Sequence, residues 1–169
     1  MSMISFARGV PAPECLPVEA LADCARSALL RDGKTILSYG PSPGYGPLRA
    51  RLAEQHGVDQ SRIFLTNGSL QGFVFLAQRL APGKRVLVES PSYDRPLKIL
   101  HELGADVVEL DADEDGLDPD ALERALADGE APAFLYLIPT FQNPSGRTLP
   151  LDRRLRVVEL AERCGLLVL

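Results

Sequence analysis

The sequence predicts an α/β fold with a mostly parallel sheet and helices on both of its faces. Short apolar runs rich in β-branched residues alternate with segments of helical periodicity, and turn-forming residues separate them. Repeated strand–helix units of this kind imply parallel strands joined by crossover helices. With 169 residues, the chain is long enough to bury a substantial core.

The first residues are expected to precede the sheet. Residues 1–16 contain scattered prolines and a glycine, which is typical of an irregular leader. Pro17 is well placed to begin a helix over about 18–31, because proline suits the first helical turn. Apolar residues recur on one face of that helix.

A structured loop is expected after this helix. Residues 38–47 hold three glycines, three prolines and two tyrosines. A second helix then begins at Pro47 and ends at Gly57. We therefore divide the chain into an amino-terminal part, residues 1–57, and a sheet domain, residues 58–169.

The sheet domain is expected to alternate strands with helices. The expected strands are residues 63–65, 85–89, 105–110, 133–138 and 166–169. The expected helices are residues 69–80, 93–103, 119–127 and 151–164. An acidic surface loop is expected at residues 111–116. Because the last apolar run reaches the end of the chain, we expect these residues to be the amino-terminal portion of a longer protein.

Polar groups follow three of the expected strands. The turn Thr66-Asn67-Gly68-Ser69 opens a helix, whose free N–H groups and dipole suit a phosphate, although a serine N-cap is the simpler interpretation. Tyr93 could stack on a planar ring or only pack against its neighbours.

The third group is Asn143, in the loop after residues 134–138, which two prolines stiffen and in which a glycine permits a tight turn. Its amide could bind a ligand oxygen, or it could only form an Asn-Pro turn. Ligands of open α/β sheets bind at the carboxyl ends of the strands. Together the three groups describe a receptor for a planar aromatic phosphate, which pyridoxal 5′-phosphate fits. No metal site is expected, because three scattered cysteines and the acidic loop lack ligand spacing.

These motifs, taken in order, resemble the amino-terminal part of fold-type I pyridoxal-phosphate enzymes, in particular class I/II aminotransferases. The similarity is greatest to the aminoadipate/kynurenine aminotransferase branch, which includes the enzyme domain of MocR-type regulators. The motifs that carry the resemblance are residues 4–13, Tyr39 with Gly44 and Leu48-Arg49, residues 66–72, Pro82-Gly83 with residues 89–93, and residues 139–146.

The resemblance implies a role for each cofactor-site residue. Ser69 and Leu70, beside Gly68, are expected to hold the cofactor phosphate, although the family commonly has glutamine where this chain has Leu70. Tyr93 is expected to stack on the pyridine ring. Asn143 is expected to donate a hydrogen bond to the phenolic oxygen of that ring.

The resemblance also implies roles for two residues of the amino-terminal part. Tyr39 is expected to reach the phosphate bound by the partner subunit of a homodimer, so residues 1–57 include a dimer-contact loop. Gly9 is expected to line the site of the substrate carboxylate. A cis peptide bond is implied at Asn143–Pro144 and is allowed at Ser90–Pro91.

The catalytic lysine of the family is expected to be absent from this chain. The lysines present are Lys34, Lys84 and Lys98, and none follows an expected strand beside the ring site. A Schiff-base lysine is required for amino transfer. The parent protein is therefore expected to be an aminotransferase acting on an amino acid and a 2-oxo acid, while this chain alone is expected to be inactive.

Composition excludes some functions and leaves others open. The net charge of −5 argues against a nucleic-acid partner, and no apolar run is long enough to span a membrane. A cytoplasmic location is expected by default. Three alternatives to an aminotransferase remain: a lyase or cyclising enzyme of the same fold, the ligand-sensing domain of a MocR-type regulator, and a non-catalytic remnant.

Overall fold

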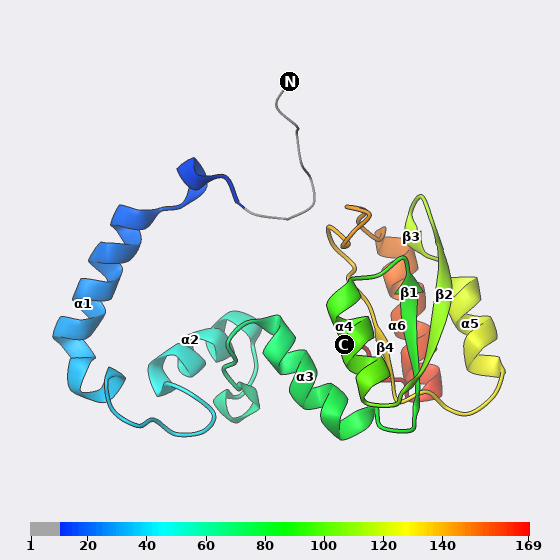
Figure 1. Ribbon diagram of the computed structural model, residues 1–169, viewed down its shortest axis with the longest axis horizontal. Helices are drawn as coiled ribbons and strands as arrows, with labels where there is room; N and C mark the ends of the chain where they lie inside the picture. Colours follow the sequence, from blue (N-terminus) through cyan, green and yellow to red (C-terminus); the bar gives the residue numbers. More distant parts are fainter. Residues whose placement is uncertain (1–10) are drawn as a thin grey trace. The chain divides into compact units, whose positions relative to one another are not determined.

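The protein is described here by a computed structural model whose defined part is residues 11–169. The chain forms two compact units, Met1–Leu65 and Thr66–Leu169. Figure 1 shows the first unit as helices and loops, and the second as a sheet with helices on both faces. The second unit contains the ends of strands at which the sequence predicts a ligand site.

The first unit contains two α-helices. Helix α1, Val18–Ile36, continues beyond the predicted end at residue 31 and is kinked at Asp32, where φ is −128°. Helix α2, Gly46–His56, ends as predicted at Gly57, whose φ of 62° is the left-handed conformation of a helix C-cap. Short 3₁₀ turns occur at Pro13–Cys15 and Gln60–Arg62.

The predicted strand at residues 63–65 is wrong. The Leu65 N–H donates to the Pro43 carbonyl at 3.0 Å, and the Ile63 carbonyl accepts from the Arg49 side chain at 2.7 Å. These backbone groups are therefore engaged by a loop and a side chain instead of a neighbouring strand. Leu65 also packs against Gly44, where an added Cβ would lie 2.7 Å from the leucine side chain.

The second unit is built on a four-stranded sheet with the order β3-β2-β1-β4. Its strands are β1 Arg85–Ser90, β2 Asp106–Asp113, β3 Gly116–Leu117 and β4 Phe134–Tyr136. Strand β1 runs parallel to both β2 and β4, while β3 is antiparallel to β2. The mostly parallel sheet is thus confirmed.

A further extended segment lies beside β4. The Leu135 N–H donates to the Leu167 carbonyl at 2.8 Å, and the Leu169 N–H donates to the Leu135 carbonyl at 2.8 Å. A parallel bridge joins Leu135 to Val168. The apolar run after Gly165 therefore pairs with the sheet as expected, although it forms only this bridge.

The predicted acidic loop at 111–116 is instead a β-hairpin. Strand β2 continues to Asp113, whose side chain accepts the Asp115 N–H at 2.8 Å and so closes the turn before β3. Arg153 donates to both carboxylate oxygens of Asp113 at 2.7 Å. These hydrogen bonds lower the pKa of Asp113 to about 2 and fasten the hairpin to a helix beneath it.

Helices cover both faces of the sheet, as predicted. Helices α3 Ser69–Leu80 and α4 Asp94–Glu102 pack on one face, and α5 Pro119–Ala127 and α6 Leu151–Cys164 on the other (Figure 1). Strand β1 serves both faces, because Val86 and Val88 join the α3–α4 core while Leu87 joins the α5–α6 core. Asp118 caps α5 by accepting the Asp120 N–H, as its sequence predicts.

Candidate functional site

A cavity of about 330 Å³ lies at the carboxyl ends of β1 and β4. The start of α3, the start of α4 and the chain after β4 contribute its walls. Its lining residues are Ser69, Leu70, Phe73, Tyr93, Pro96, Tyr136, Leu137, Ile138, Pro139 and Leu169. The position agrees with the rule that ligands of open α/β sheets bind outside the carboxyl ends of the strands.

The start of α3 presents free backbone donors to this cavity. The N-cap is Gly68, with φ 82° and ψ 165°, a conformation that favours glycine. The simpler interpretation of Ser69 as an N-cap is therefore wrong, because Ser69 is the first helical residue. Within residues 11–169, neither the Ser69 nor the Leu70 N–H has a hydrogen-bond partner. These donors and the helix dipole suit an anion.

Two side chains hold the turn before α3. The Thr66 hydroxyl donates to the Gly68 carbonyl at 3.0 Å, and the Asn67 N–H donates to the Gln71 side chain at 2.6 Å. Both bonds fix the turn from the side without using the N–H groups of the first helical residues. The turn is thus held in place while the N–H groups of Ser69 and Leu70 stay free.

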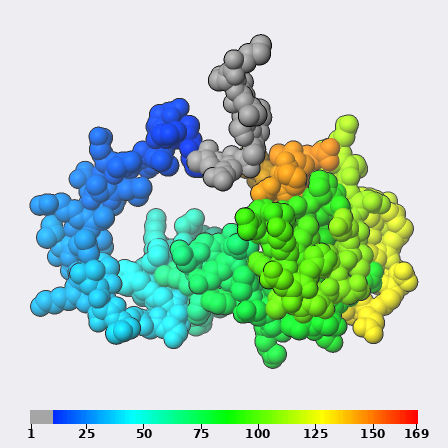
Figure 2. Space-filling view, in the orientation of Figure 1, coloured from blue at the N-terminus to red at the C-terminus, as the bar shows by residue number. Residues whose placement is uncertain are grey.

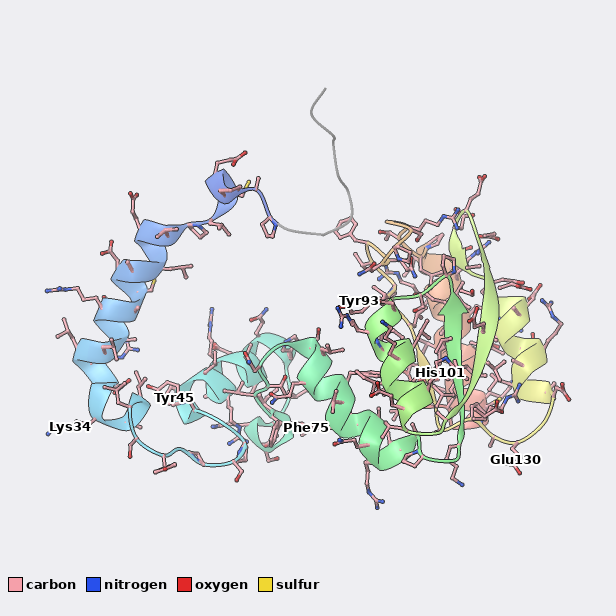
Figure 3. The ribbon with its side chains drawn as sticks, in the orientation of Figure 1. Lys34, Tyr45, Phe75, Tyr93, His101 and Glu130 are labelled. Atoms are coloured by element: carbon pink, nitrogen blue, oxygen red, sulfur yellow. The ribbon has the colours of Figure 1, made fainter. Side chains whose placement is uncertain are left out.

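Aromatic side chains form another wall of the cavity. Tyr93, the N-cap of α4, is half-buried at the end of the turn that follows β1 (Figure 3). Tyr136 ends β4 and packs edge-on against Phe73, with ring centroids 5.1 Å apart. Burial raises the pKa of Tyr136, and the nearby Glu89 carboxyl raises it further by a smaller amount. A planar ligand would find aromatic surface on this side.

The loop after β4 is closed at its base by hydrogen bonds. The Leu149 N–H donates to the Pro139 carbonyl at 2.9 Å. The Arg154 guanidinium donates to the Leu149 carbonyl and to the Pro139 carbonyl, each at 2.6 Å. The loop, orange in Figure 2, lies at the surface of the sheet unit. Its Asn143–Pro144 bond is cis, as expected, and so is Ser90–Pro91.

Within this loop the buried side chain is Gln142 instead of Asn143. Asn143 is exposed and is not among the residues that line the cavity. Gln142 is 5% exposed and donates to the Pro91 carbonyl at 2.7 Å, while its side-chain oxygen accepts the Ser145 N–H at 2.8 Å. The structure therefore brings together Ser69, Leu70 and Tyr93 in one cavity and leaves Asn143 outside its lining.

Sequence reasoning missed a buried carboxyl group near the cavity. Glu89 is 2% exposed at the end of β1 and accepts the Ile138 N–H at 3.0 Å. Burial raises the pKa of this carboxyl, and hydrogen bonds from Ile138 and Gln142 partly oppose that rise. A single acidic residue within an otherwise apolar strand was the signal that could have identified it.

The other candidate residues do not line this cavity or fall outside the described residues. Tyr39 is fully exposed in the first unit, after α1, and Gly9 lies outside the described residues. Lys34, Lys84 and Lys98 are exposed, and none of them lines the cavity. Across residues 11–169, no cluster of three or more histidine, cysteine or acidic residues could hold a metal ion.

A helix start with free donors, set beside tyrosines at the carboxyl edge of a parallel sheet, is an arrangement typical of phosphate sites in α/β proteins. The sequence model of the aminotransferase class I and II family matches residues 2–169, and the chain belongs to this family. The match includes every segment that forms the cavity.

The chain is also similar in sequence to individual aminotransferases. The chain is 42% identical to the 2-aminoadipate transaminase of Thermus thermophilus over 98% of its length, and 33% identical to aromatic-amino-acid aminotransferase 1 of Thermococcus litoralis, also over 98%. In each case it spans 42% of the length of the relative. No helix within residues 11–169 is long and apolar enough to cross a membrane.

Solved structures show the same fold. The α-aminoadipate aminotransferase LysN from Thermus thermophilus, complexed with N-(5′-phosphopyridoxyl)-L-leucine, matches with a TM-score of 0.88 at 42% identity. That match covers 96% of this chain and 42% of LysN. An archaeal alanine:glyoxylate aminotransferase matches with a TM-score of 0.89 at 33% identity, covering 99% of this chain and 44% of the other. The predicted α/β fold is confirmed, while the similarity to MocR-type regulators stays a prediction.

Proposed function

We propose that this chain forms the phosphate and ring cradle of a pyridoxal-phosphate-dependent aminotransferase, which moves an amino group between an amino acid and a 2-oxo acid. The observation that carries the proposal is the start of α3, where the free Ser69 and Leu70 N–H groups border a cavity walled by Tyr93 and Tyr136. This donor set fits a phosphate attached to a planar ring.

Each residue then has a separate task. The Ser69 and Leu70 N–H groups, with the Ser69 hydroxyl, bind the phosphate, and Gly68 gives the turn the backbone conformation that aims them. Leu70 adds no side-chain hydrogen bond. Tyr93 stacks on the ring and fixes its plane, and Asn143 binds the phenolic oxygen from the loop after β4. When bound, pyridoxal phosphate supplies an electron sink for the α-carbon of an amino acid.

The remainder of the site comes from elsewhere in a longer protein. The chain spans 42% of the length of these two relatives, and Lys34, Lys84 and Lys98 are exposed and do not line the cavity. The lysine that binds the cofactor is therefore supplied by another part of the protein. We further propose a homodimer in which Tyr39 reaches the phosphate of the partner subunit, and a role for Gly9 at the substrate carboxylate. Exposed apolar side chains on α1, such as Leu21 and Leu30, support a subunit contact there.

Amino-transfer activity is the direct test. The full-length protein, loaded with pyridoxal phosphate, is incubated with 2-oxoglutarate and each donor of a panel that includes 2-aminoadipate and aromatic amino acids, and glutamate is measured. We expect at least one donor to produce glutamate at about 1 s⁻¹ or faster, a typical enzymatic turnover.

Controls separate this activity from background. Reactions without the donor, and with cofactor but no protein, should yield no glutamate. Silence across the panel from protein that holds the cofactor would contradict transamination. A decarboxylated or cyclised product in place of glutamate would assign the site to a lyase or cyclising enzyme instead.

A further inference from the structure

Two ligand contacts of the proposed function lie on separate segments of the second unit. Tyr93 follows the turn at the end of β1, while Asn143 lies in the loop after β4. A stacked ring and a bound phenolic oxygen belong to one rigid ligand, so both segments must be held in a fixed relation. A misplacement of about 1 Å is enough to impair such a site.

Gln142 joins these two segments directly. Its side-chain nitrogen donates to the Pro91 carbonyl at 2.7 Å, within the turn that leads to Tyr93. Its side-chain oxygen accepts the Ser145 N–H at 2.8 Å, within the loop that contains Asn143. Because Gln142 is 5% exposed, water can replace neither bond without opening the loop.

Glu89 also connects the end of β1 with the chain that follows β4. Its carboxylate accepts the Ile138 N–H at 3.0 Å, so the end of β1 holds the backbone at the entry to the loop. The Gln142 side chain also lowers the pKa of this carboxyl group, against the effect of burial. Glu89 is 2% exposed and forms no salt bridge within residues 11–169, so its stabilisation depends on the hydrogen bond from Ile138.

We propose that Glu89 and Gln142 are positioning residues that hold the Asn143 loop in register with the Tyr93 turn. The proposal rests on the proposed function, because it assumes that Asn143 and Tyr93 contact the same ligand. Neither Glu89 nor Gln142 touches the ligand itself. They act through the backbone of the two segments that they join.

The test is a double-mutant cycle on pyridoxal phosphate affinity in the full-length protein. Gln142→Met keeps the length of the side chain but removes both of its hydrogen bonds, and we expect the Kd to rise about tenfold. In an Asn143→Ala background the same change should raise the Kd less than about twofold, because the contact it positions is already lost. Kd is read from the absorbance and fluorescence of the bound cofactor, and unfolding is measured in parallel.

Matched variants distinguish positioning from general destabilisation. Gln60→Met makes the same substitution at an exposed position, where it removes the bond from the Gln60 side chain to the Gly46 carbonyl at 3.1 Å, and should leave the Kd unchanged within about twofold. Glu89→Gln keeps an oxygen for the Ile138 N–H and should stay within about threefold, whereas Glu89→Leu should lose about tenfold. If Gln142→Met does not fold, Gln142→Glu, which has no donor for Pro91, takes its place in the cycle.

Several results would overturn the proposal. Additive effects of Gln142→Met and Asn143→Ala on the Kd would show that the two residues act independently. A lower stability of Gln142→Met with an unchanged Kd would show that Gln142 has only a structural role. A wild-type Kd for Glu89→Leu would show that Glu89 does not position the ligand contacts. Wild-type affinity in Asn143→Ala would refute the Asn143 contact and the positioning role with it. Wild-type protein that does not bind pyridoxal phosphate would instead refute the proposed function.

Discussion

Ser69→Asp is expected to weaken pyridoxal phosphate binding at least about a hundredfold while the protein stays folded. Ser69 is the first residue of α3, where free N–H groups and the positive end of the helix dipole border the cavity. A carboxylate at this position would occupy the donors and repel the phosphate. The same carboxylate stabilises the helix by about 0.3–1 kcal/mol, so folding should not suffer.

The phosphate group itself provides the comparison. Full-length wild type and variant are titrated with pyridoxal phosphate and with pyridoxal, which has the same ring but no phosphate. The loss of affinity should be large for the phosphorylated compound and less than about threefold for pyridoxal, because ring contacts are unchanged.

Leu151→Asp is the matched control for charge and position. Leu151 is the first residue of α6, is 70% exposed and does not line the cavity. The Leu151→Asp substitution adds the same charge at the same place in a helix, and the affinity for pyridoxal phosphate should stay at the wild-type value. Unchanged phosphate binding in Ser69→Asp, or an equal loss for pyridoxal, would show that the start of α3 does not bind the phosphate.

Phe134→Ala is expected to lower the free energy of unfolding by about 3–5 kcal/mol. Phe134 is fully buried in β4, paired with Val86 of β1, and its ring meets Phe73 edge-on with centroids 6.3 Å apart. Truncation removes a large apolar surface and leaves a void between the sheet and α3. Because Phe73 also lines the ligand cavity, the cavity wall should loosen as well.

Urea unfolding curves monitored by circular dichroism measure this decrease in the free energy of unfolding. Phe141→Ala makes the same substitution at a side chain that is 79% exposed, and should change stability by less than about 0.5 kcal/mol. If Phe134→Ala cost no more than Phe141→Ala, the α3–α4 core would not be the packed layer that the structure describes.

Much of the sheet unit could be predicted because local signals mark its elements. Helix α6 has the predicted bounds, since Pro150 precedes it and Gly165 adopts the left-handed conformation that ends it. The alternation of strands and helices likewise predicts parallel strands with helices on both faces. These features depend on residues that are neighbours in the sequence.

The features that were missed depend on contacts between distant residues. Residues 111–116 contain charges typical of a solvated loop, yet Arg153, forty positions from Asp113, secures them as a hairpin. An apolar pattern predicts a strand at 63–65, but the Pro43 carbonyl and the Arg49 side chain engage its backbone. No local pattern specifies either partner.

In the candidate site, too, residues marked by local sequence signals were predicted, and residues defined by distant partners were missed. Ser69 and Tyr93 were predicted from their places after expected strands, and both line the cavity, although the strand expected before Ser69 does not form. Glu89 and Gln142 were not predicted, because their partners Ile138 and Pro91 lie 49 and 51 positions away. A buried polar group acquires its function from the partner that folding brings to it.

We expect this chain to bind the cofactor without supplying the lysine that anchors it. The decisive measurement adds pyridoxal phosphate to the 169-residue chain and to the full-length protein, reduces both with borohydride, and maps the modified lysines by mass spectrometry. We expect labelling of Lys34, Lys84 and Lys98 in the folded chain to match that of the urea-unfolded chain. In the full-length protein, one adduct per subunit should form on a lysine outside these 169 residues. Stoichiometric labelling of one of the three lysines in the folded chain alone would contradict the claim.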